Sequence, residues 1–376
     1  MTDIRVLFDH QIFSEQQYGG ISNCFVQLIA NMPNNIKVKL GLRYTENYHL
    51  LNSNIGFKNT WTIKDMHKFG YHFLEKHCVT FFHTPNNMTY RYSKKLMAQG
   101  NYDILHATYF DPYFLQYNTR PFVITIHDMI PEIYHFEEKQ IIGKKVLAEK
   151  ASHIITVSEC TKKDLMRILK IPEEKITVIY HGFESREITQ KTSPIGSPYI
   201  LYVGARWCYK GFAYFISQVS RFLDEHPEFY IACTGGEFTE DEILMLKRYK
   251  IYERTIHRFC TTDELNQLYS HAFAFVFPSE YEGFGMPILE AFHAGCPVLL
   301  NNKSCFSEIA EDAALYFDSD SDENTLLFQL NRLYNMSHTE KQSLYYKEKE
   351  RISFFSWEKS AAKLAEVYRK VLQSNY

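Results

Sequence analysis

The sequence lacks a long hydrophobic run and any segment typical of a leader peptide. No stretch reaches the roughly 18 uninterrupted apolar residues of a membrane-spanning helix. Residues 1–5 lead directly into the apolar residues 6–8, without the apolar core and cleavage site of a signal peptide. These absences predict a cytoplasmic protein.

Several nucleotide and hydrolase motifs are also missing. The sequence has no Gly-x-x-x-x-Gly-Lys-Ser/Thr loop and no Gly-x-Gly-x-x-Gly turn after its first strand. This argues against P-loop enzymes and nicotinamide enzymes. A Gly-x-Ser-x-Gly elbow is absent too, which argues against a serine hydrolase.

The eight cysteines form no Cys-x-x-Cys pair, and none stands at metal-ligand spacing with neighbouring Cys or His residues. We therefore expect apolar core cysteines in a reducing compartment, with no metal site. Net charge is nearly balanced, with 41 basic and 44 acidic residues, so no overall field attracts nucleic acid. We expect no nucleic-acid partner.

The length and the pattern of the chain predict two α/β domains. A chain of 376 residues suits two domains, each of roughly 150–200 residues. Apolar β-branched runs alternate with helical periodicity throughout, which is typical of parallel sheets with crossover helices. The predicted parts are an N-terminal domain, a Ser-, Thr- and Pro-containing linker, a C-terminal domain and an amphipathic C-terminal helix, at residues 1–184, 185–198, 199–356 and 357–376. The helix could cross back to the first domain.

The most informative segment is 278–291, which reads as a strand end, a glycine-rich loop and a helix. Gly283 and Gly285 allow close approach of the backbone to a ligand, and the helix start attracts an anion. Glu282 and Glu290 suit sugar or ribose hydroxyls better than phosphate, because carboxylates repel phosphate. The alternative is an ordinary tight turn with exposed Glu side chains.

Three further pairs of residues lie beside predicted strands or helices. Arg206 and Lys210 occupy one loop and could clamp a leaving diphosphate, although a solvated basic loop is the alternative. Gly19-Gly20 leads into a helix, where backbone amides could bind an anion. His127-Asp128 follows a buried strand and should face the ligand edge of the sheet, or His127 is a structural histidine.

Together these segments resemble glycosyltransferase family 4, a family of retaining enzymes with the GT-B fold. The resemblance covers nearly the whole chain, and Glu282 and Glu290 match the family's Glu-x7-Glu motif. Further matching segments lie at residues 18–21, 125–131, 157–159, 181–182, 204–211 and 278–297. One departure is Lys210-Gly211, where many relatives carry Lys-Asn, and this puts one neighbouring polar contact in doubt.

The resemblance implies two Rossmann-like domains that face a cleft, and it implies roles for the matching residues. Arg206, Lys210 and Gly20 would bind the donor diphosphate. Glu290 would hold the ribose. Glu282 and the amides of Gly283, Phe284 and Gly285 would hold the donor sugar, with His127 near the reacting centre. The implied catalytic residues are His127, Arg206, Lys210 and Glu282, and no metal or other cofactor is required.

The run 127–131 is most similar to bacterial transferases of surface polysaccharide biosynthesis, which favours GDP-mannose as donor. UDP-glucose and dTDP-rhamnose remain alternatives, as do an epimerase and a non-catalytic nucleotide-sugar-binding protein. The acceptor would be a glycan, which could be linked to a lipid diphosphate. Residues 61–100 hold six basic and two acidic residues among aromatic ones. They could touch the inner face of the cell membrane, or form a solvated helical face.

Overall fold

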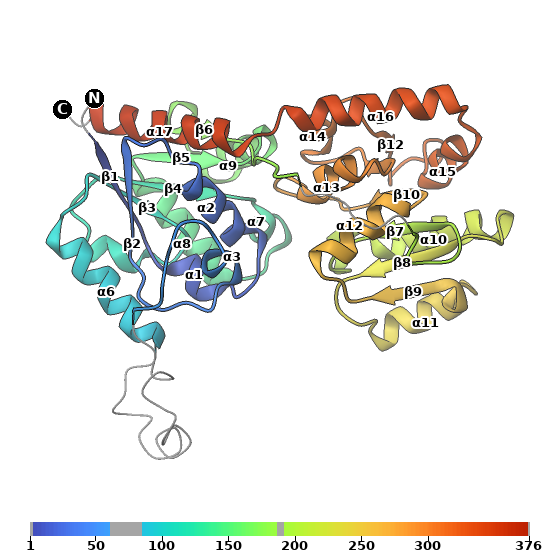
Figure 1. Cartoon of the computed structure of the whole chain (residues 1–376), viewed down its shortest axis with the longest axis horizontal. Coiled ribbons are helices and arrows are strands. Elements are labelled where there is room, and N and C mark those ends of the chain that lie inside the picture. Colours follow the sequence, from blue (N-terminus) through green and yellow to red (C-terminus); the bar gives the residue numbers. More distant parts are fainter. Residues whose placement is uncertain (1–2, 61–84, 186–191, 375–376) are drawn as a thin grey trace, which may run out of the picture. The chain divides into compact units, whose positions relative to one another are not determined.

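The computed structural model describes residues 3–60, 85–185 and 192–374. They form two compact units, Met1–Gly182 with Trp357–Tyr376, and Phe183–Ser356 (Figure 1). The described parts of the predicted linker, residue 185 and residues 192–198, therefore belong to the second unit. The predicted α/β architecture with two Rossmann-like domains is confirmed.

The first unit contains a six-stranded parallel sheet in the order β2-β1-β3-β4-β5-β6. All residues of β3, β4 and β5 are buried, as their near-continuous apolar sequences require in a parallel sheet covered on both faces. The strands are β1 (Ile4–Phe8), β2 (Ile36–Leu40), β3 (Ile104–Ala107), β4 (Phe122–Ile126), β5 (His153–Thr156) and β6 (Ile176–Val178).

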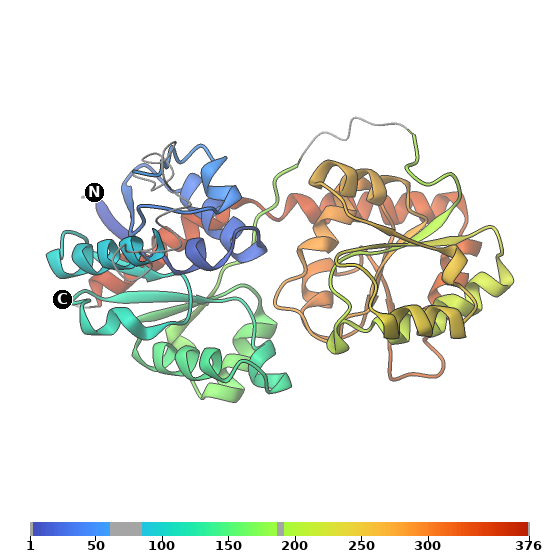
Figure 2. The same ribbon diagram turned by 90° about the horizontal axis from the view of Figure 1, so that it is seen from below.

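Helices cover both faces of this sheet, with the blue and red helices on one side and the green ones on the other (Figure 2). The helices before β4 are α1 (Gln11–Glu15), α2 (Gly20–Ala30), α3 (Tyr48–Leu51) and α6 (Pro85–Gln99). Those after it are α7 (Ile130–Tyr134), α8 (Glu138–Lys150), α9 (Glu159–Leu169) and α17 (Trp357–Gln373).

Helix α17 is the part of the C-terminal sequence that returns to the first unit. Its apolar stripe, including Leu364, Tyr368 and Val371, joins the core formed by β1 and α2. The Tyr368 hydroxyl lies 2.7 Å from Nδ1 of His106 on β3, which fixes the helix to the buried centre of the sheet. The crossing that the amphipathic pattern suggested is therefore present.

The second unit contains another six-stranded parallel sheet, in the order β12-β11-β10-β7-β8-β9. Its strands are β7 (Tyr199–Tyr202), β8 (Tyr230–Thr234), β9 (Thr255–Arg258), β10 (Ala274–Phe277), β11 (Val298–Asn301) and β12 (Leu315–Phe317). From β7 the sheet extends through β8 and β9 to one edge, and from β10 it extends through β11 and β12 to the other edge. The loops after these two neighbouring strands therefore border the switch point at which such sheets bind ligands.

The helices of the second unit surround this sheet. They are α10 (Phe212–Glu225), α11 (Glu240–Arg248), α12 (Thr262–His271), α13 (Met286–Ala294), α14 (Phe306–Ala310), α15 (Leu326–Asn335) and α16 (His338–Ser353). Helix α10 has the strongest amphipathic pattern and buries Phe215, Ile216 and Val219 against the sheet. Within the described ranges of both units, no helix is long and apolar enough to cross a membrane.

Candidate functional site

The loops after β7 and β10 are tied together at the switch point of the second sheet. The Glu280 amide donates a 2.8 Å hydrogen bond to the Tyr209 carbonyl. Gly211 has a φ of +69°, and a Cβ there would lie 2.2 Å from the Pro278 carbonyl oxygen. This close approach leaves no room for an asparagine side chain, which explains why a glycine rather than an asparagine follows Lys210 in this chain.

Lys210 and Glu282 meet across these two loops. Lys210 Nζ lies 2.6 Å from Glu282 Oε1, and the two side chains are only 19% and 13% exposed. The ammonium also lies 5.0 Å from the centre of the Tyr209 ring. The switch point therefore holds an opposite-charge pair that is partly shielded from water.

The backbone after Glu282 is fixed by the loop that follows β11. The Glu282 amide donates to Ser304 Oγ at 3.0 Å, and the Ser304 hydroxyl donates to the Glu282 carbonyl at 2.7 Å. The Cys305 thiol lies 3.2 Å from the carbonyls of Glu282 and Phe284. Neither supporting residue could be identified from the sequence, because only the strand order brings their loop beside β10.

Helix α13 begins after Gly285, which adopts a φ of +93°. Gly283 lies half-buried in the preceding loop, and Phe284 is buried against Phe355 at a ring distance of 5.6 Å. One turn into the helix, Glu290 accepts a 3.2 Å hydrogen bond from the Tyr269 hydroxyl. The second unit therefore brings Glu282, the glycine-rich turn and Glu290 into one strand-loop-helix segment.

Arg206 has a different set of partners from Lys210. Its Nε lies 2.9 Å from Glu242, and its Nη atoms donate to the carbonyls of Thr234, Gly236 and Glu237. The side chain is 5% exposed. Arg206 thus anchors the loop between β8 and α11, and contact with a diphosphate would require it to leave some of these partners.

In the first unit, His127 follows β4 and is 7% exposed. Burial lowers the pKa of His127 well below its ordinary value, and the neighbouring His181, His106 and Lys144 lower it further. The ring is therefore neutral at pH 7. It lies 5.6 Å from the ring of His181, which follows β6.

A buried ion pair supports the loop that carries His127. Lys144 Nζ lies 2.9 Å from Glu132 Oε2 and donates to the Asp128 carbonyl at 3.0 Å. The two side chains are 1% and 3% exposed. Only a weak signal in the sequence marks this pair, since Glu132 and Lys144 are charged residues among the otherwise uncharged buried positions of α7 and α8.

Gly20 is the first residue of α2, and a Cβ there would meet nothing within 4 Å. The Gln16 side chain accepts a 3.1 Å hydrogen bond from the Ser22 amide, so it occupies part of the helix N-terminus. Beside this turn, the Tyr18 ring stacks on Tyr48 at 4.6 Å, and both rings are exposed. Gly20 and His127 belong to the first unit, whereas the other candidate residues belong to the second.

Two family models match this chain. The model described as Glycosyl transferases group 1 matches residues 184–351, and the one described as Glycosyltransferase Family 4 matches residues 67–187. Together they extend across both units.

Among curated relatives, the O-antigen chain mannosyltransferase RfbU of Salmonella typhimurium is 30% identical over 206 residues, which are 54% of this chain and 58% of the relative. The O-antigen chain mannosyltransferase B of Escherichia coli is 26% identical, over 55% of this chain and 59% of the relative. The matches thus span less than two thirds of the length of either relative.

Solved structures share the fold over almost the whole chain. HepE of Anabaena, in complex with UDP and glucose, has a TM-score of 0.69 at 18% identity, covering 98% of this chain and 100% of its own. Sucrose-phosphate synthase of Thermosynechococcus elongatus also has a TM-score of 0.69 at 18% identity, covering 99% and 100%. At this identity the likeness concerns the fold alone.

Proposed function

We propose that the chain is a member of glycosyltransferase family 4, and that it transfers a hexose from a nucleotide sugar to a growing glycan. We favour mannose from GDP-mannose, because two of the relatives are mannosyltransferases of O-antigen chains. UDP-glucose is the second candidate donor, since HepE was solved with UDP and glucose. A dTDP-rhamnose donor fits the same motifs.

The observation that carries the proposal is the Lys210–Glu282 pair at the switch point of the second sheet. In the proposed complex, Lys210 turns from Glu282 to the donor diphosphate and stabilises it as it leaves. Glu282 then accepts hydrogen bonds from the sugar hydroxyls, with the amides of Gly283, Phe284 and Gly285 beside it. Glu290 holds the ribose hydroxyls.

We assign Arg206 a part in the same step. Its guanidinium fixes the loop after β8 and contributes positive potential, and it binds the diphosphate if it exchanges a carbonyl partner for phosphate oxygens. In this proposal, protein cations neutralise the leaving group and no metal ion is needed. The anomeric configuration is retained by front-face attack, with the leaving phosphate oxygen accepting the proton of the acceptor hydroxyl.

The first unit supplies the other proposed contacts. Gly20 contributes backbone contact to the phosphates, and its open Cβ position is compatible with close approach of a ligand. His127 lies near the sugar and the reacting centre. Because its ring is neutral, it can accept or donate a hydrogen bond without placing another charge beside the sugar.

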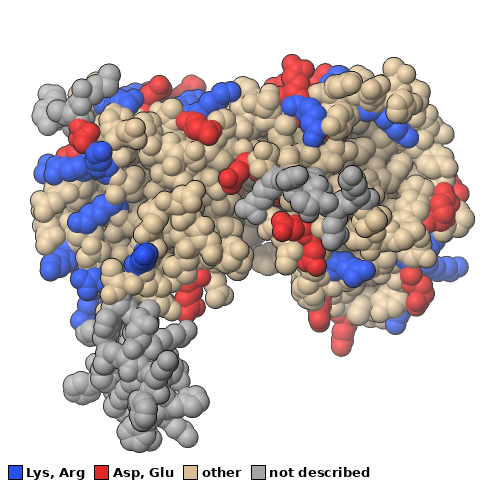
Figure 3. All heavy atoms as spheres, in the orientation of Figure 1, with Lys and Arg blue, Asp and Glu red and all other residues tan. Residues whose placement is uncertain are grey.

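A glycan acceptor is consistent with the exposed aromatic platform of Tyr18 and Tyr48, because sugar C–H faces pack on aromatic rings. Peripheral contact at the cytoplasmic membrane face remains part of the proposal. Residues 61–84 of the basic aromatic segment lie outside the described residues. Within α6, Arg91 and Lys95 are exposed, and Figure 3 shows Lys and Arg side chains along this edge of the first unit.

The first test is thermal melting of the full chain with GDP, UDP, dTDP, ADP or NAD, without added metal. A ligand that binds only the folded state stabilises it by about 2.7 kcal/mol at a hundredfold excess over its Kd. We expect a selective shift with one nucleoside diphosphate, which also identifies the donor base. A shift with NAD alone, or none with any diphosphate, would contradict the proposal.

Product analysis with the matching nucleotide sugar then tests transfer. A labelled hexose should appear on a glycan acceptor, whereas an epimerase would change the donor without any acceptor. Lys210→Ala and Arg206→Ala should each lower turnover by about 10²–10³-fold, in line with loss of one charge-stabilising contact. Glu290→Ala should mainly weaken nucleotide binding.

A further inference from the structure

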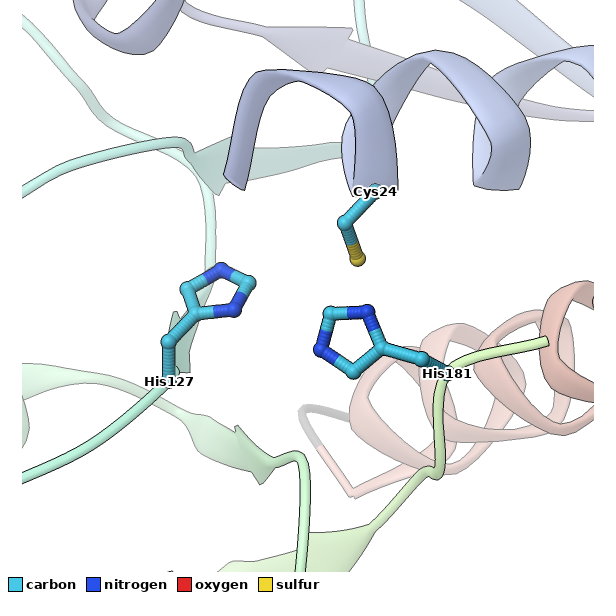
Figure 4. A group of neighbouring side chains, drawn as sticks. All are labelled: Cys24, His127 and His181. Carbon is cyan, nitrogen blue, oxygen red and sulfur yellow. The ribbon is translucent and has the colours of Figure 1, made fainter. Parts of the chain in front are cut away.

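Three side chains outside the Lys210–Glu282 pair converge inside the first unit. Cys24 lies on α2, His127 follows β4 and His181 follows β6, and all three point toward one another (Figure 4). One ligand atom from each residue, a thiol sulfur and two imidazole nitrogens, lies within 4.8 Å of the other two. These segments are distant in the sequence, so linear spacing gave no sign of the cluster.

The interior of this cluster contains an unsatisfied polar atom. Cys24 is 3% exposed and both histidines are 7% exposed. Within the described residues, Nε2 of His127 has no hydrogen-bond partner. A buried polar atom without a partner costs about 1–3 kcal/mol, so a group that engages this nitrogen would remove an existing penalty.

We propose that Cys24, His127 and His181 form a binding site for a divalent transition-metal ion of the zinc class. One thiolate and two imidazoles make a donor set that suits zinc, whereas Mg²⁺ and Ca²⁺ prefer oxygen ligands. Three protein ligands leave a fourth tetrahedral position for water or another small ligand.

The geometry requires only a small contraction. In a tetrahedral site with metal–nitrogen and metal–sulfur bonds of about 2.0–2.3 Å, neighbouring ligand atoms lie about 3.4–3.6 Å apart. Atoms now within 4.8 Å of one another must therefore approach by about 1 Å, which side-chain rotations can provide. As the metal–sulfur bond forms, the Cys24 thiol releases its proton to solvent, and both imidazoles bind through nitrogen lone pairs.

This inference goes beyond the proposed transfer reaction, which uses no metal. Binding would occupy a lone pair of His127, a residue proposed to lie near the reacting centre. The ion would therefore act as an inhibitor of that reaction rather than as its cofactor. A titration of the chain with a metal ion requires neither nucleotide sugar nor turnover, so its result is independent of the proposed function.

The experiment is a titration of the reduced, metal-free full chain with Co²⁺, followed by absorption spectroscopy. Tetrahedral cobalt with a thiolate ligand gives visible d–d bands and a near-ultraviolet sulfur-to-cobalt charge-transfer band. We expect both at one equivalent of Co²⁺ per chain, and we expect Zn²⁺ to displace the colour, as the Irving–Williams order requires.

Cys24→Ala should abolish the charge-transfer band and weaken Co²⁺ binding at least tenfold. The matched control is Cys78→Ser, which removes a cysteine next to His77 in the sequence and should leave the spectrum unchanged. Circular dichroism of each metal-free variant checks its fold. If Cys24→Ala does not fold, His181→Gln provides the second test, since it keeps the thiol and should still weaken binding at least tenfold.

A wild-type chain without a charge-transfer band would overturn the proposal. So would a folded Cys24→Ala chain that keeps the band, or a Cys78→Ser chain that loses it.

Discussion

The ion pair between Lys210 and Glu282 predicts that neutralising a carboxylate will strengthen nucleotide binding. If Lys210 binds the donor diphosphate, the phosphate must compete with Glu282 for the same ammonium. Glu282→Gln removes this competitor and one negative charge from the binding region. Nucleoside diphosphate, which carries no sugar for Glu282 to bind, should therefore bind more tightly to the variant.

The magnitude follows from the pair's geometry. Exposed ion pairs contribute about 0.2–1 kcal/mol, and limited exposure of 19% and 13% places this pair near the upper end. If binding no longer has to break an ion pair worth about 1 kcal/mol, the Kd of the nucleoside diphosphate for Glu282→Gln falls about fivefold, because 1.4 kcal/mol corresponds to tenfold. Lys210→Met should act in the opposite direction and raise Kd about tenfold or more, through loss of a charge-assisted contact.

Isothermal titration calorimetry can measure both changes with the diphosphate that shifts the melting temperature. Glu280→Gln is the matched control, because Glu280 is an exposed carboxylate two residues earlier in the same loop. Glu280→Gln changes the net charge by the same amount and leaves the Lys210–Glu282 ion pair intact, so the Kd of the nucleoside diphosphate for this variant should change less than twofold. Unchanged or weaker binding of the nucleoside diphosphate to Glu282→Gln would refute the competition between carboxylate and phosphate. An equal decrease of Kd in Glu282→Gln and Glu280→Gln would show that the change in net charge alone explains the effect.

Three further predictions concern stability. Burial raises the pKa of Glu348 to about 9, so its folded state retains a proton that the unfolded state releases above about pH 4.5. Stability should therefore fall as the pH rises from 5 to 9, and in urea unfolding Glu348→Gln should flatten this slope whereas exposed Glu350→Gln should not. Tyr368→Phe should cost about 1–3 kcal/mol by leaving Nδ1 of His106 without its hydroxyl partner, and a melting temperature equal to wild type would contradict this. Gly211→Ala should lower the free energy of unfolding by about 2–4 kcal/mol, because left-handed strain adds to the backbone clash, and a loss below about 0.5 kcal/mol would count against that contact.

Local sequence patterns were sufficient to predict much of the fold. Apolar β-branched runs identified the central strands, because a parallel strand covered on both faces has little room for polar residues. The edge strand β2, Ile36–Leu40, fits this pattern less well. Only its first residue is fully buried, so the apolar pattern marked its position weakly.

The candidate site could be predicted only in part, because its decisive contacts depend on strand order. The sequence indicated Lys210 and Glu282 separately, and the adjacency of β7 and β10 brings them together. It also indicated Arg206 as a ligand of the diphosphate or as part of a solvated basic loop, whereas the structure engages this side chain with Glu242 and loop carbonyls. No local pattern at Cys24 could show which distant histidines would surround it.

Helix α17 has a consequence for the order in which this protein can fold during synthesis. The second unit is one continuous stretch of chain, so its core needs no residue from another part of the sequence. The first unit begins earlier but needs Tyr368 and the rest of the α17 stripe to finish its core. The half that is translated first therefore cannot finish its core until α17 has been made, and until then the apolar surface beside α2 is open to chaperones or to misassembly.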